Sequence, residues 1–64
     1  MMILELGKWY DFKVGDAGHE IEVRGQLVGF EASGGKQGLR FFLSDQFDYS
    51  VIMPASIFRI KEVH

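Results

Sequence analysis

This 64-residue sequence contains no cysteine and only one proline. Without cysteine the chain has neither disulfides nor a cysteine-ligated zinc, the two staples that stabilise many proteins of this size. Residues 1–64 are expected to form a single domain, and a chain this short buries roughly 60% of its unfolded surface, so its stability is marginal. Aromatic packing or self-association must therefore supply the stability that cross-links do not.

The chain also lacks an excess of positive charge and a long apolar run. Seven Lys and Arg against nine Asp and Glu give a net charge of −2, which disfavours nucleic acid as a partner because such binding needs a basic footprint. The apolar start, residues 1–4, is interrupted by Glu5 and has no basic segment, so we expect no signal peptide, membrane anchor or membrane partner. The expected location is cytoplasmic.

Short alternating segments predict strands, whereas no apolar run keeps the 3.6-residue period of a helix. In residues 8–14 the side chains of Tyr10, Phe12 and Val14 share one face, and Trp9 lies on the other. Residues 15–18 have the composition of a turn.

Residues 19–31 are expected to form a long strand bent at Gly25 and Gly29. The side chains predicted on its first face are those of Ile21, Val23 and Leu27. Past the bend, Val28 and Phe30 fall on the opposite face, as in a strand that serves both sides of a barrel.

The remaining segments complete a small all-β fold. Residues 32–38 contain three glycines and are expected to form an exposed hairpin loop. Residues 39–44, 49–53 and 57–63 are predicted strands, with Leu39, Phe41 and Leu43 inward and a short helical turn at Pro54–Ser56. We therefore predict a single five-stranded, SH3-like antiparallel barrel.

The sequence holds nine aromatic rings, more than one small barrel encloses, so some are expected to face outward. Aromatic rings and arginine are typical of the centre of a protein interface. The hypothesised contact surface consists of Trp9, Arg24, Phe30, Arg40 and Phe42. The alternative is that these rings fill the ends of the barrel.

Catalytic and metal-binding patterns are weak. On a strand, His19 points away from Glu20 and Glu22, so these residues do not converge on a metal. The carboxylate pairs are expected to be exposed, with no apolar pocket to separate their pKa values, and there is no cysteine nucleophile. We expect no enzyme, no metal and no cofactor.

Three resemblances bear on the fold. Residues 54–60 resemble the end of SH3 domains. Residues 25–30, Gly-Gln-Leu-Val-Gly-Phe, are similar to a Gly-Gln-Ile-Val-Gly-Trp segment of the plasmid-borne type II dihydrofolate reductases, which are SH3-like barrels assembled around a pore, although Val51-Ile52-Met53 stands where that family has its catalytic motif. Residues 23–31 resemble the first Sm motif of the Sm and LSm ring proteins, which implies RNA binding.

The function expected from these patterns is a non-enzymatic binding module that acts through protein–protein contacts, including contacts with itself. One alternative is a nucleic-acid-binding small barrel, Sm-like or OB-like, with bases stacked on Trp9 and Phe42. A second, based on size alone, is a phage or mobile-element inhibitor of a host enzyme. The remote alternative is a pore-type reductase built around Ile52 and Tyr49.

Overall fold

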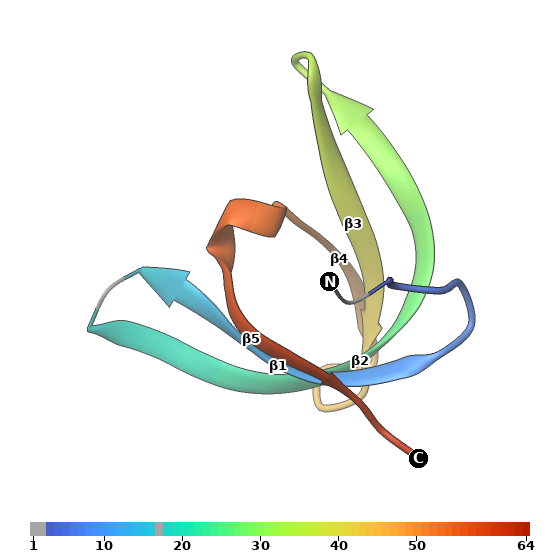
Figure 1. Cartoon of the computed structure of the whole chain (residues 1–64), viewed down its shortest axis with the longest axis vertical. Helices are drawn as coiled ribbons and strands as arrows, with labels where there is room; N and C mark the ends of the chain where they lie inside the picture. The colour runs from blue at the N-terminus through green and yellow to red at the C-terminus, as the bar shows by residue number, and fades with distance from the viewer. Residues whose placement is uncertain (1–2, 17) are drawn as a thin grey trace.

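The computed structural model describes residues 3–16 and 18–64. Met1 and Met2 of the apolar start and Ala17 of the predicted turn lie outside the described residues. The elements are β1 (Trp9–Asp16), β2 (His19–Ser33), β3 (Lys36–Leu43), β4 (Asp48–Ile52), the 3₁₀ turn η1 (Pro54–Ser56) and β5 (Ile57–Glu62). All strands belong to one antiparallel sheet (Figure 1). The predicted all-β class, the five strands and the helical turn are confirmed. Over the described residues, no helix is long and apolar enough to cross a bilayer.

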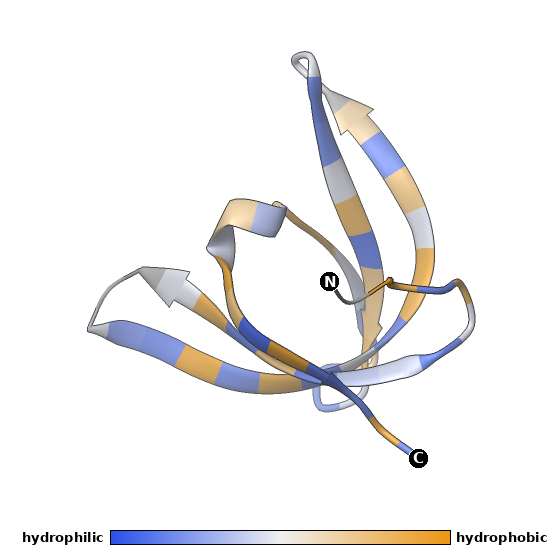
Figure 2. Ribbon diagram, viewed as in Figure 1, coloured by the Kyte–Doolittle hydropathy of each residue, from blue (hydrophilic) through white to orange (hydrophobic). Residues whose placement is uncertain are grey.

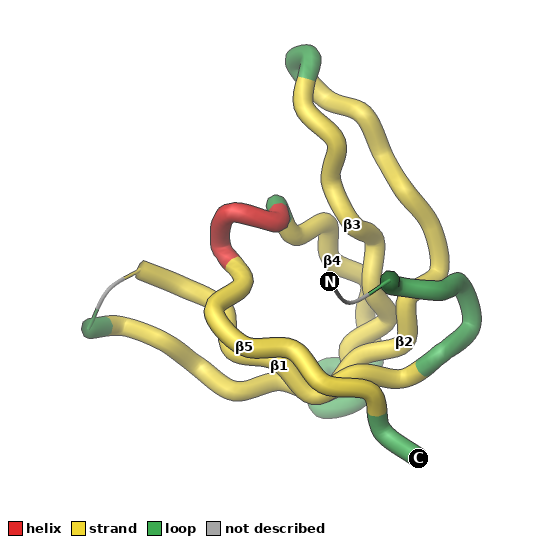
Figure 3. The backbone as a smooth tube through the Cα atoms, viewed as in Figure 1, coloured by secondary structure: helices red, strands yellow, loops and turns green. Residues whose placement is uncertain are grey.

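The sheet curls around its own core. Its strand order is β4-β3-β2-β1-β5, and the molecule measures 31 × 30 × 28 Å, so no direction is as thin as a flat sheet. Strands β4 and β5 are the two edges, and η1 carries the chain from one to the other (Figure 3). Backbone pairing in the described part of the chain joins β4 to β3 and β5 to β1. Closure of the sheet into a barrel stays a prediction.

The core lies on the concave face of the sheet, where the strands place alternate apolar side chains (Figure 2). Phe41 is its centre, with ring centroids 4.6 Å from Phe12 and 6.5 Å from Tyr10. The buried side chains are Tyr10, Phe12, Val23, Leu27, Leu39, Phe41, Leu43 and Ile52. The inward positions predicted on β1 and β3 are confirmed at Tyr10, Phe12, Leu39, Phe41 and Leu43.

Gly25 leaves room where three strands meet. It lies opposite Tyr10 of β1 and Leu43 of β3. A Cβ at this position would approach the Leu43 Cδ2 and the Phe42 carbonyl oxygen to 3.1 Å, whereas one at Gly29 would meet no atom within 4 Å. The two predicted bend glycines therefore differ, because only Gly25 is required by close packing.

The predicted loop at residues 32–38 is wrong. Strands β2 and β3 continue to Ser33 and Lys36, and only Gly34 and Gly35 form the turn between them. Both glycines have positive φ, 57° and 78°. A two-residue hairpin turn of this kind needs left-handed backbone at both central positions, and the glycine pair supplies it.

Phe30 is exposed, as predicted, but it lies on the other face of the sheet. The β2–β3 register shifts between Leu27 and Gly29, and Phe30 then lies directly opposite the buried Leu39. Residues directly opposite each other share a face, so the bulge moves Phe30 to the core side of the sheet. Its side chain is still 51% exposed because the β2–β3 hairpin extends past the core (Figure 1).

Candidate binding surface

The convex face carries a row of aromatic side chains that crosses the sheet. Trp9, Gln26, Phe42 and Tyr49 are directly opposite one another on β1, β2, β3 and β4. The ring centroids are 6.4 Å apart between Trp9 and Phe42 and 5.3 Å between Phe42 and Tyr49, both edge to face. We call Trp9, Phe42 and Tyr49 the aromatic row.

Gln26 allows this row to be continuous. It lies between Trp9 and Phe42 in the sheet, and its side-chain amide donates a hydrogen bond to the Gly7 carbonyl oxygen at 3.0 Å. This bond directs the amide toward the chain segment before β1. The indole and phenyl rings consequently meet across β2 in the edge-to-face geometry that aromatic pairs prefer.

Arg40 extends the row toward solvent. Its guanidinium lies 5.4 Å from the centroid of the Tyr49 ring, and it forms an ion pair with Glu31 at 3.7 Å. Tyr49 is 54% exposed, so the end of the row on β4 is open while Trp9 and Phe42 are half-buried. An exposed ring stacked on a guanidinium has the composition of an interface centre.

Arg24 forms a salt bridge within the chain. It lies opposite Asp11, and its Nε and Nη2 donate hydrogen bonds to the two Asp11 carboxylate oxygens at 2.7 and 3.0 Å. These hydrogen bonds hold the pKa of Asp11 below its ordinary value and raise the pKa of Arg24. The pair clamps β1 to β2, so the Arg24 donors facing Asp11 are engaged within the chain.

The structure thus places Trp9, Arg24, Arg40 and Phe42 of the predicted contact set on the convex face and turns Phe30 to the other side of the sheet. Sequence reasoning missed Tyr49 as a member of this surface. The signal was present, because a tight connection between the third and fourth strands places the outward residues on either side of it opposite each other. Their pairing depends on register, which a one-residue slip would invert.

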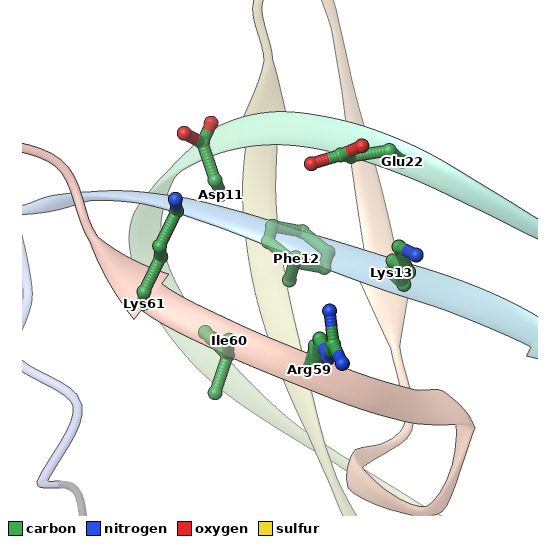
Figure 4. Close-up of a pocket in the computed structure, with 7 residues that line it drawn as sticks. All are labelled: Asp11, Phe12, Lys13, Glu22, Arg59, Ile60 and Lys61. Atoms are coloured by element: carbon green, nitrogen blue, oxygen red, sulfur yellow. The ribbon is translucent and has the colours of Figure 1, made fainter.

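A second feature of the convex face is a hollow of about 160 Å³ over β1, β2 and β5. It is lined by Asp11, Phe12, Lys13, Glu22, Arg59, Ile60 and Lys61 (Figure 4). Lys13 lies directly opposite Arg59 on β5, a pairing of like charges that destabilises a sheet, and directly opposite Glu22 on β2. We call the basic side chains Lys13, Arg59 and Lys61 the cationic hollow.

Among the side chains that the structure describes, no three His, Cys, Asp or Glu lie close enough together to hold a metal ion. The resemblances to SH3 domains, to type II dihydrofolate reductases and to Sm proteins stay predictions. Comparison of this chain with protein-family models, with curated proteins and with solved structures finds no match.

Proposed function

We propose that this protein is a binding module that acts through protein–protein contacts, with the aromatic row at the centre of its contact surface. The observation that carries the proposal is the continuous packing of Trp9, Phe42 and Tyr49 on the convex face, outside the core. Three rings and a stacked arginine on a pleated, rigid support supply contact area at little entropic cost. Such a surface suits an apolar or aromatic anchor of a partner.

The single tryptophan makes the proposal directly testable. Trp9 belongs to the aromatic row, so a partner that covers the row changes its fluorescence emission and its quenching by acrylamide. Proteins retained by the immobilised chain would be purified and titrated against it. The matched variant Tyr49→Ser removes the exposed ring without touching the core, and we expect it to weaken binding about tenfold or more.

Two results would overturn this proposal. One is a purified partner that binds Tyr49→Ser as tightly as the original chain. The other is quenching of Trp9 by a single-stranded oligonucleotide, with affinity that falls steeply as salt rises. That outcome would favour the nucleic-acid alternative, in which bases stack on the same rings and Arg40 meets phosphate.

A further inference from the structure

The tight turn between β3 and β4, residues 44–47, presents a phenylalanine to solvent in a strained backbone conformation. Phe47 has φ 50° and is the only non-glycine residue with positive φ among the described residues. Its side chain is 82% exposed. A bulky residue in the left-handed region is an outlier where asparagine or glycine would be unstrained, and nothing in the core is gained from this ring.

Strain of this kind at an exposed tip points to a function. The backbone on both sides of Phe47 is fixed: the Ser44 N–H donates to the Arg24 carbonyl oxygen at 3.0 Å, and the Tyr49 N–H donates to Asp48 Oδ1 at 2.8 Å. The ring is therefore held out by an ordered turn. Asp45 and Asp48 flank it, so the tip is an apolar ring between two carboxylates.

The cationic hollow has the complementary chemistry. Figure 4 shows Arg59 and Lys61 of β5 near Lys13 and Phe12 of β1, with Asp11 and Glu22 also in the lining. No carboxylate of the described residues forms an ion pair with these three cations, although Glu22 and Asp11 line the same hollow, Glu22 opposite Lys13 and Asp11 opposite Lys61. An incoming carboxylate would relieve the repulsion between Lys13 and Arg59.

We propose that the Phe47 turn of one copy of this chain docks into the cationic hollow of a second copy, with Asp45 and Asp48 facing Lys13, Arg59 and Lys61. The turn carries two carboxylates, whereas the hollow carries three cations against two carboxylates, so the net charges of the two surfaces are opposite. An aromatic ring beside a guanidinium adds cation–π attraction. The contact joins two different surfaces, the Phe47 turn and the cationic hollow, and each copy of the chain carries both of them. This inference specifies how the chain associates with itself, and it rests on the proposed binding function.

The same geometry argues against pairing through the sheet edges. On β4, Asp48 already accepts the Tyr49 N–H, and Pro54 follows the strand. On β5, the register with β1 shifts around Phe58, and Arg59 and Lys61 stand on the strand. Bulges, proline and charges are the devices by which edge strands avoid other strands. Association through a turn and a hollow needs no backbone pairing at either edge.

The test is the molar mass of the full chain by light scattering over a concentration series. We expect the original chain to exceed the monomer mass as concentration rises. Phe47→Asn removes the ring and relieves the backbone, so it should stay monomeric with an equal or higher melting temperature. That combination separates a lost contact from a lost fold. An original chain that is monomeric throughout, or a Phe47→Asn chain that associates equally well, would overturn the inference.

A charge exchange identifies the two surfaces. Asp45→Lys and Arg59→Glu should each be monomeric because each places like charges in the contact, and an equimolar mixture should associate again. Lys36→Glu, at the far end of β3, changes net charge as Arg59→Glu does and should associate like the original chain. If the mixture stays monomeric, or Lys36→Glu is also impaired, the specific pairing is wrong. Binding of a different protein through the aromatic row is tested separately with the Tyr49→Ser variant.

Discussion

Trp9 and Phe42 pack edge to face although their strands are not neighbours, because the Gln26 side chain between them bonds to Gly7 instead of standing over the sheet. The two rings lie outside the core, and each covers part of the other. This relationship makes the convex face apolar at its centre without weakening the concave side. Substitutions on the convex face and in the core should therefore have different effects on stability.

Replacing Trp9 with alanine should leave the chain folded. The substitution removes one half-buried ring from the convex face, so we expect a loss of about 1–2 kcal/mol in the free energy of unfolding. The matched change in the core, Phe41→Ala, should cost about 3–5 kcal/mol and unfold a domain of this size. Circular dichroism of both variants checks this, and a Trp9→Ala chain without strand signal would place the indole in the core.

The two glycines of β2 should respond differently to alanine. Gly25→Ala introduces a Cβ that meets Leu43 and the Phe42 backbone at 3.1 Å, and we expect it to destabilise the fold by about 1–3 kcal/mol. Gly29→Ala meets open space and should change stability by less than about 0.5 kcal/mol. Urea unfolding of the pair provides the comparison. Equal effects would mean that the crowding at Gly25 is absent.

Acid should selectively weaken the clamp between Asp11 and Arg24. The pKa of Asp11 is lowered in the folded chain, chiefly by the hydrogen bonds from Arg24, with the charge of Lys61 contributing. The ionised carboxylate therefore stabilises the fold above its ordinary pKa near 3.8, and this stabilisation is lost as pH falls through the folded value. We expect Asp11→Asn to melt below the original chain at pH 7 and to lose less melting temperature on acidification. A constant difference between the two chains from pH 7 to pH 2 would contradict the linkage.

The hydroxyl of Tyr10 should hold the segment before β1. The Glu5 N–H donates to the Tyr10 hydroxyl oxygen at 2.8 Å, and Gly7 and Lys8 hydrogen-bond to the backbone of Leu27. Tyr10→Phe keeps the buried ring and removes the acceptor, with an expected cost of about 1 kcal/mol. Amide exchange should accelerate at Glu5 while the amides of β3 keep their protection. Unchanged exchange at Glu5 would show that the hydroxyl does not anchor this segment.

Alternation in the sequence was sufficient to predict the strands and most of the core, because a half-buried strand shows its two faces directly. It failed at Phe30, where the bulge between Leu27 and Gly29 shifts the phase by one residue without any change in composition. Four of the five predicted surface residues, Trp9, Arg24, Arg40 and Phe42, lie on the convex face. Tyr49 and the strain at Phe47 depend on cross-strand register and on a backbone angle, which a single sequence does not display.

The strand order also predicts the sequence in which the strands pair during folding. Hairpins β1–β2, β2–β3 and β3–β4 join segments adjacent in the sequence, whereas β5 pairs with β1 from the opposite end of the chain. Closing that long loop costs more chain entropy, so we expect β5 to dock last, with amide protection in Lys61 appearing after protection in Phe41 during refolding. Until β5 arrives, β1 is an open edge. Newly made chains would then pass through a state that is more prone to aggregate than the native fold.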